Sequence, residues 1–112
     1  MKLNEVKDIL SAKILCGDEK MDTEVLAACG CDLMSDVLAF VKDQALLLTG
    51  LINPQVVRTA EMMDMKAIVF VRGKIPAPEI IDLAKESEIV VMSTVQPLYL
   101  ACGMLYSKGL YK

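Results

Sequence analysis

The stretch Ala45–Gly73 limits the folds open to this chain more than any other part of its sequence. It consists of an apolar run, Ala45–Thr49, a segment in which apolar residues recur at helical spacing, and a second apolar run, Ala67–Val71. Between the runs, Asn53 and Pro54 are a typical helix start, because asparagine can cap a helix and proline is tolerated at its first position. Strands that are apolar on both faces and joined by an amphipathic helix indicate a buried parallel pair.

The same pattern continues along the chain. Apolar runs begin at Ala45, Ala67 and Ile89, each 22 residues after the previous one. We therefore expect an α/β fold with a small, mostly parallel sheet flanked by helices, in which successive helices share a face until the direction across the sheet switches. With 112 residues, the chain 1–112 is expected to form a single domain. The other predicted elements are a helix over Leu3–Leu10, strands over Lys13–Cys16 and Thr23–Gly30, a helix whose apolar stripe runs from Leu33 to Val41, a helix that begins at Pro76, a strand over Ile89–Met92 and a final helix from Gln96 to Ser107.

The composition excludes several classes of function. The net charge is −3 and the isoelectric point is near 4.9, whereas surfaces that bind nucleic acid are basic. Hydrophobic residues make up 54% of the chain, too many for a disordered protein. Its uninterrupted apolar runs are far shorter than a membrane span, and acidic residues near the start are unlike a secretory signal. We expect a cytoplasmic protein with neither nucleic acid nor a membrane as partner.

Cysteine and histidine usage argues against a metal centre and against catalysis. The chain has four cysteines, Cys16, Cys29, Cys31 and Cys102, and no histidine. Cys29 and Cys31 form C-x-C, so a zinc site would need all four thiolates. We interpret the cysteines as small buried hydrophobes and expect neither a metal nor another cofactor; a metal or redox site is the alternative. The usual general base is missing, and no Walker A, G-x-G-x-x-G or G-x-S-x-G motif occurs, so we expect no enzyme.

Candidate ligand-binding residues follow the three apolar runs. Open parallel sheets bind ligands beyond the carboxyl ends of their strands, and each of these ends leads to a helix N-terminus, which favours anions. The cations and hydroxyls at these ends suit a phosphate or a carboxylate. The same residues also suit a purely structural role as turn glycines, caps and solvated side chains. The candidates are Thr49, Gly50, Asn53, Arg72, Gly73, Lys74, Ser93 and Thr94.

The last predicted helix is apolar on all sides. From Leu98 to Tyr106, every residue except Gly103 is hydrophobic. One face can cover the sheet, but a helix that is apolar all round is usually buried all round, which a chain of this size rarely achieves alone. We therefore expect a homodimer that associates through this helix. The candidate interface residues are Leu98, Tyr99, Leu100, Met104 and Tyr106.

Several short stretches resemble the DRTGG domain, a module that is itself similar to the N-terminal, non-catalytic domain of HPr kinase/phosphorylase. They are the opening helix and strand, Asp22–Val25, the Ser35 region and the sequences LLLTG, AIVFVRG and IVVMST. Ile52-Asn53 stands where the family's aspartate–arginine pair is expected, and Val71-Arg72-Gly73 keeps only the final glycine of the later motif. The resemblance implies a small α/β fold without catalytic machinery. In relatives this module accompanies CBS domains, phosphotransacetylases or pyrophosphatases and serves regulation and subunit association.

These observations lead to three hypotheses about function. The leading one is a non-catalytic regulatory or assembly module that forms a homodimer and has a partner protein. The first alternative is a sensor domain for a nucleotide or a phosphorylated metabolite, bound near Thr49, Arg72, Lys74 and Ser93. The second alternative is a cysteine-based metal or redox accessory protein.

Overall fold

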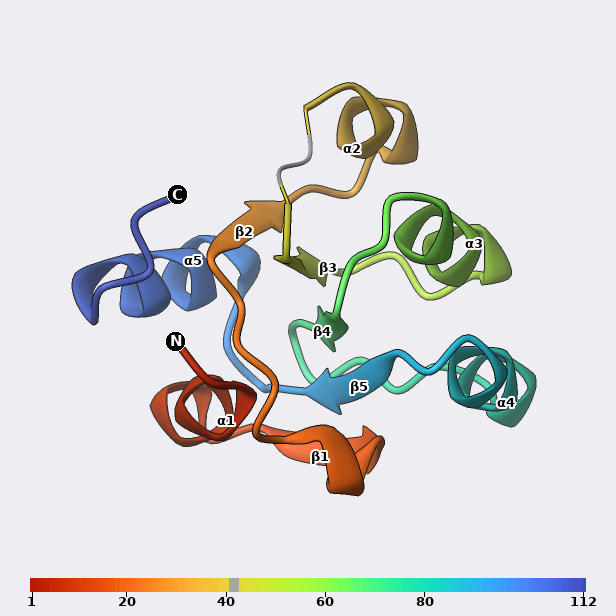
Figure 1. Ribbon diagram of the computed structural model, residues 1–112, viewed down its shortest axis with the longest axis horizontal. Helices are drawn as coiled ribbons and strands as arrows, with labels where there is room; N and C mark the ends of the chain where they lie inside the picture. The colour runs from red at the N-terminus through yellow and green to blue at the C-terminus, as the bar shows by residue number, and fades with distance from the viewer. Residues whose placement is uncertain (41–42) are drawn as a thin grey trace.

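The computed structural model describes residues 1–40 and 43–112, and within them a five-stranded sheet is covered by helices on both faces (Figure 1). This is the small, mostly parallel α/β architecture expected from the sequence. The strands are β1 (Lys13–Cys16), β2 (Ala27–Gly30), β3 (Ala45–Thr49), β4 (Ala67–Phe70) and β5 (Val90–Ser93). The helices are α1 (Leu3–Leu10), the 3₁₀ turn η1 (Asp18–Lys20), α2 (Met34–Phe40), α3 (Pro54–Met62), α4 (Pro78–Glu86) and α5 (Leu98–Ser107).

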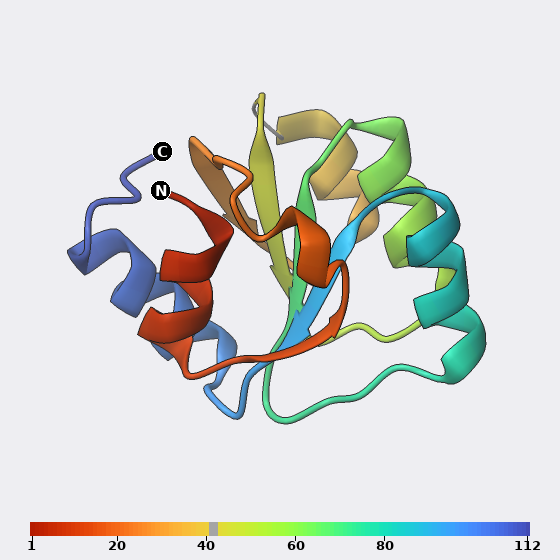
Figure 2. The ribbon, with the colours of Figure 1, turned by 60° about the horizontal axis from the view of Figure 1, so that its bottom comes forward.

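The strand order is β1-β5-β4-β3-β2, and all neighbours are parallel except β1, which pairs antiparallel with β5. The residues of β3, β4 and β5 are buried throughout, because helices cover both faces of the sheet. The register places Thr49 beside Phe70 and Phe70 beside Ser93, so these three strands end at the same level. The loops that follow them therefore gather at one edge of the sheet, at the lower end of Figure 2.

Helices α2, α3 and α4 lie on one face of the sheet, and α1 and α5 lie on the other (Figure 1). Successive side chains of a strand point to opposite faces. Leu47 accordingly packs in the core under α2, α3 and α4, whereas Leu46 and Leu48 pack in the core under α1 and α5. The chain thus keeps its helices on one face from β2 to β5, as successive right-handed crossovers in one direction require, and α5, which follows the last strand, packs on the other face (Figure 1).

The start of α3 follows the expected capping pattern. The Asn53 Oδ1 atom accepts a hydrogen bond from the Val56 N–H at 3.3 Å, and Pro54 is the first helical residue. Asparagine satisfies one of the free N–H groups of the first turn, and proline has no N–H to satisfy. The helix therefore begins at the residues that the sequence indicated.

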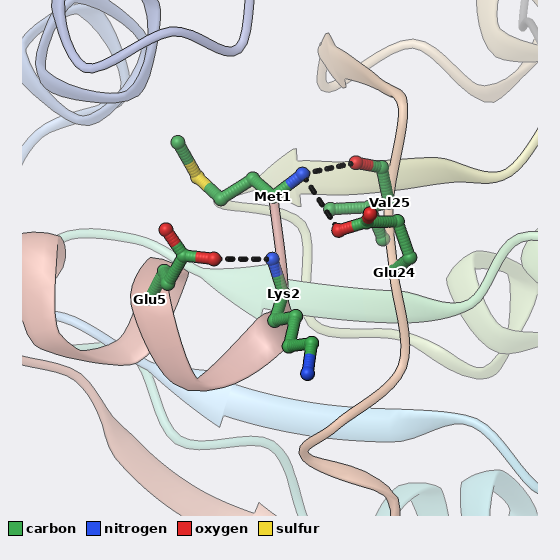
Figure 3. Close-up of polar contacts among 5 residues, drawn as sticks. All are labelled: Met1, Lys2, Glu5, Glu24 and Val25. Atoms are coloured by element: carbon green, nitrogen blue, oxygen red, sulfur yellow. Dashed lines mark hydrogen bonds and ion pairs between the residues drawn. The ribbon is translucent and has the colours of Figure 1, made fainter.

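The predicted strand over Thr23–Gly30 is shorter than expected, because β2 begins at Ala27. The residues before β2 pair with the N-terminal segment instead: the Leu3 N–H donates to the Thr23 carbonyl, and the Val25 N–H donates to the Met1 carbonyl. Figure 3 shows the Met1 amino group between the Glu24 carboxylate, at 2.9 Å, and the Val25 carbonyl, at 3.1 Å. These backbone hydrogen bonds of the segment just before β2 are therefore made with the N-terminal segment and not with a strand of the sheet.

Other predicted boundaries differ by one or two residues. The helices expected from Pro76 and from Gln96 begin at Pro78 and at Leu98, as α4 and α5. The strand expected over Ile89–Met92 is found one residue later, as β5. Val41, the last residue of the apolar stripe predicted for α2, lies outside the described residues. The bounds of α1 agree with the prediction.

Candidate functional site

The loops after β3, β4 and β5 are joined to one another by backbone hydrogen bonds. The Val71 N–H donates to the Thr49 carbonyl at 3.0 Å, and the Gly73 N–H donates to the Thr94 carbonyl at 2.8 Å. The Arg72 N–H donates to the Gln96 carbonyl at 2.9 Å. The structure thus brings the residues predicted to bind a ligand to one edge of the sheet. We call this edge, formed by residues 49–53, 72–74 and 93–96, the carboxyl edge.

Arg72 is the most prominent group of the carboxyl edge. Its backbone lies in the left-handed region, with φ of 58°, and its side chain is exposed. The guanidinium group reaches across to Gly50, where a Cβ atom would lie 2.7 Å from Nη2. Because Gly50 has no side chain, the guanidinium can rest against the backbone that ends β3.

Asp32 is a site residue that the sequence analysis missed. It lies just beyond β2, and its Oδ1 atom accepts hydrogen bonds from the Gly50 N–H at 2.7 Å and from the Thr49 hydroxyl at 2.9 Å. The bond from Gly50 contributes most to lowering the pKa of Asp32; the Thr49 hydroxyl and the charges of Arg72 and Lys74 add to this, and partial burial opposes it. Asp32 directly precedes the helix predicted from Leu33, and an aspartate at such a position is typical of a helix cap. Its place after a strand parallel to β3 was the signal that could have identified it.

The hydroxyl groups of the carboxyl edge are engaged within the protein. The Thr49 Oγ1 atom, besides its bond to Asp32, accepts the Leu51 N–H at 3.1 Å. The Ser93 hydroxyl donates to the Lys74 carbonyl at 2.8 Å. The Thr94 hydroxyl points to the opposite core and donates to the Leu10 carbonyl, at the end of α1, at 2.8 Å. Thr49, Ser93 and Thr94 therefore use their hydroxyl groups for hydrogen bonds within the protein that shape this part of the structure.

The two cations of the carboxyl edge have no carboxylate partner in the described part of the chain. The ion pairs found there involve the Met1 amino group, Lys7, Lys20 and Lys66. The charges of Arg72 and Lys74 help to lower the pKa of Asp32, but neither side chain forms an ion pair with it. Both cations thus keep their hydrogen-bond donors available for a ligand.

The four cysteines are distributed over both faces of the sheet. All four are free thiols; Cys16 is buried and the other three are half-buried. Burial raises the pKa of the Cys16, Cys29 and Cys102 thiols, so these sulfurs are protonated at neutral pH. Within residues 1–40 and 43–112, no three cysteine or carboxylate side chains lie close enough together to hold a metal ion.

Helix α5 divides its apolar residues between the core and the solvent. Ala101 and Leu105 are buried, and Leu98, Cys102 and Met104 pack partly against the core under α1 and α5. The exposed fraction is 86% for Tyr99, 49% for Leu100 and 59% for Tyr106. We call these three residues the α5 surface. No helix in the described part of the chain is long and apolar enough to cross a membrane.

Met62 and Met65 do not extend the α5 surface. Met65 is buried in the core on the other side of the sheet. Met62 is exposed, but it ends α3, which lies on the face opposite to α5 (Figure 1). An interface that uses α5 would therefore not include either methionine.

The fold defines a small, mostly parallel α/β domain with helices on both faces of the sheet. The chain belongs to the DRTGG domain family, whose model matches residues 5–105. The resemblance noted in the sequence is thereby confirmed. Comparison with functionally curated proteins finds no significant match.

A solved structure with a similar fold is the regulatory region of a Clostridium perfringens pyrophosphatase, which consists of CBS and DRTGG domains and was determined with its activator, diadenosine tetraphosphate. The TM-score is 0.74 at 18% sequence identity, and the match covers 93% of this chain. It covers 45% of the neighbour's chain, so the present chain spans less than half the length of that solved chain. In that pyrophosphatase the DRTGG domain belongs to a regulatory region.

Proposed function

We propose that this DRTGG domain is a non-catalytic regulatory module that senses a phosphate-bearing small molecule, in the first instance a nucleotide, at the carboxyl edge. The observation that carries the proposal is the Arg72 guanidinium resting against Gly50, with Lys74 two residues further along the chain. The pyrophosphatase regulatory region that shares this fold is complexed with a nucleotide activator, which supports a nucleotide over other phosphate esters.

The physical basis of the proposal is the chemistry of the two cations. A guanidinium group binds phosphate oxygens through two parallel hydrogen bonds, and an ammonium group adds a point charge. The edge beyond the carboxyl ends of parallel strands is where open α/β sheets bind ligands. Because the Thr49 hydroxyl and the Gly50 N–H already bond to Asp32, we assign phosphate binding to Arg72 and Lys74 and not to the hydroxyl groups.

A thermal-shift screen tests this proposal. The purified protein is melted with diadenosine tetraphosphate, mononucleotides, pyrophosphate, orthophosphate and acyl phosphates. We expect stabilisation by at least one nucleotide, and we expect Arg72→Ala to abolish it. The other arginine of the chain, Arg58, is exposed on α3, so Arg58→Ala is the matched control and should bind normally. Stabilisation by no anion, or stabilisation that survives Arg72→Ala, would contradict the proposal.

We also propose that two copies of the chain associate through α5. The observation that favours this second function is the α5 surface, where two tyrosines and a leucine on one short helix are exposed. A stable dimer buries about 800 Å² per subunit, so the α5 surface would form the apolar centre of a larger contact. Size-exclusion chromatography with light scattering measures the mass in solution. A monomer at tens of micromolar would contradict this proposal while leaving the ligand site untouched.

A further inference from the structure

We infer that Asp32 makes the carboxyl edge selective for phosphate esters that carry alcohol hydroxyl groups, such as nucleotides and sugar phosphates, over anions without an alcohol hydroxyl, such as orthophosphate, pyrophosphate and acyl phosphates. This inference rests on the proposed function, because it concerns the ligand class of the same site.

The starting observation is that one oxygen of Asp32 makes both of its hydrogen bonds. Oδ1 accepts from the Gly50 N–H at 2.7 Å and from the Thr49 hydroxyl at 2.9 Å. These two bonds fix the carboxylate against the end of β3. Within residues 1–40 and 43–112, the second oxygen, Oδ2, accepts no hydrogen bond, so it can accept one from a ligand.

The second observation is that an acceptor and a donor meet at the same glycine. Asp32 bonds to the N–H of Gly50, while the Arg72 guanidinium occupies the space where the Gly50 side chain would be. A ligand at this edge therefore encounters a fixed carboxylate and a guanidinium group at the same time.

These two groups place opposite demands on a ligand. An anion that bound the Gly50 N–H would have to displace Asp32, and this would break the hydrogen bonds that Asp32 accepts from the Gly50 N–H and the Thr49 hydroxyl. An anion that instead lay beside Asp32 without a hydrogen-bond donor would be repelled by the negative charge of the carboxylate. A ligand that leaves Asp32 in place must offer its phosphate to Arg72 and a hydrogen-bond donor to Asp32. The hydroxyl groups of a ribose or another sugar, next to a phosphate ester, meet both demands. Sites built to bond a hydroxyl reject analogues that lack it.

Calorimetric titration with three probes tests the inference: ADP, pyrophosphate and 2′,3′-dideoxy-ADP, which lacks both ribose hydroxyls. We expect the protein to bind ADP about tenfold or more tightly than either of the other two probes. Asp32→Ala should remove this preference by weakening ADP binding about tenfold while leaving pyrophosphate binding equal or tighter. Arg72→Ala should weaken all three probes.

Two controls separate selectivity from folding. Asp36→Ala removes an exposed carboxylate from α2 and should keep the ADP preference. Asp32→Asn keeps an oxygen for the Gly50 and Thr49 bonds but replaces the free Oδ2 acceptor with an amide NH2 donor and loses the charge, so it should fold normally and show a reduced preference. If Asp32→Ala does not fold, Asp32→Asn and the dideoxy probe on the unaltered protein still decide the question.

The outcomes distinguish this inference from the function on which it rests. If no probe binds, the proposed function and the inference both fail. If the probes bind in an Arg72-dependent manner but dideoxy-ADP equals ADP, or if Asp32→Ala tightens ADP and pyrophosphate alike, the proposed function stands and the inference is overturned. In the latter case Asp32 only occupies the Gly50 N–H and repels anions, without binding the ligand itself.

Discussion

The Arg72 guanidinium lies so close to Gly50 that a Cβ atom at this glycine would be 2.7 Å from Nη2. The backbone of Gly50 does not adopt a positive φ, so its conformation does not require glycine. The absence of a side chain matters because it leaves space for the Arg72 guanidinium. Because the atom it would meet is the far end of a flexible side chain, Gly50→Ala can be accommodated by moving the guanidinium. This glycine therefore sets the position of Arg72.

Gly50→Ala should separate binding from stability. We expect the free energy of unfolding to change by no more than about 1 kcal/mol, since the arginine can swing outward. Nucleotide affinity should fall about tenfold, because the displaced guanidinium loses its place at the carboxyl edge. Chemical denaturation and calorimetric titration measure the two quantities. Unchanged affinity in this variant would mean that the position of Arg72 is not important for binding.

Asp32 should make the stability of the protein depend on pH. Its pKa is lowered from the ordinary value of 3.8 in the folded state, so its contribution to stability is present above that value and is lost as the pH falls through the folded-state pKa. We therefore expect Asp32→Asn to be less stable than the unaltered protein at neutral pH, with the difference shrinking in acid. Urea denaturation of both proteins across this range measures it, and a difference that grows in acid would contradict the prediction.

A buried hydroxyl joins the end of β5 to the end of α1. The Thr94 side chain is almost fully buried and donates to the Leu10 carbonyl at 2.8 Å. Thr94→Val should reduce the free energy of unfolding by about 1–3 kcal/mol, because it leaves that buried carbonyl without its donor. Ser107→Ala removes an exposed hydroxyl from the end of α5 and should change stability by less than about 0.5 kcal/mol. Equal effects of the two substitutions would show that the Leu10 bond contributes little.

The role of the α5 surface in dimer formation can be tested by introducing charged residues into it. Tyr99→Glu combined with Leu100→Glu should convert a dimer to a monomer without lowering the melting temperature of the subunit, because both side chains are exposed. Met104 is a poor choice for this purpose, since it packs partly against the core. Met62→Glu places a charge on an exposed residue of the opposite helical layer and should leave the mass in light scattering unchanged. A dimer that persists in the double variant would exclude this surface.

The sequence predicted the central part of the fold well because that part depends on local patterns. Apolar runs spaced evenly along the chain specify β3 and β4, and Asn53-Pro54 marks the start of α3. The start of β2 was missed because the alternation around Val25 reflects packing against the N-terminal segment and not pairing within the sheet. Local periodicity does not distinguish these two environments.

The candidate site was predicted only in outline. Parallel pairing explains why the residues at the strand ends lie close together. It does not determine the hydrogen-bond partner of each hydroxyl group. Ser93 and Thr94 are adjacent, yet one bonds to Lys74 within the edge and the other to Leu10 across the molecule. Asp32 was overlooked for the same reason, because its bonds reach a strand far away in the sequence while its local context favours a helix cap.

The bonds from Arg72 to Gln96 and from Gly73 to Thr94 connect the turn that carries the guanidinium to the segment that leads into α5. A ligand that moves this turn would also move the entrance to the helix proposed to hold two copies together. Ligand binding at the carboxyl edge and dimer formation through α5 would then be thermodynamically linked. Dimer formation would change the affinity for the ligand by the same factor by which the ligand changes the affinity between subunits. The dimer dissociation constant, measured with and without bound nucleotide, would give the size of that factor.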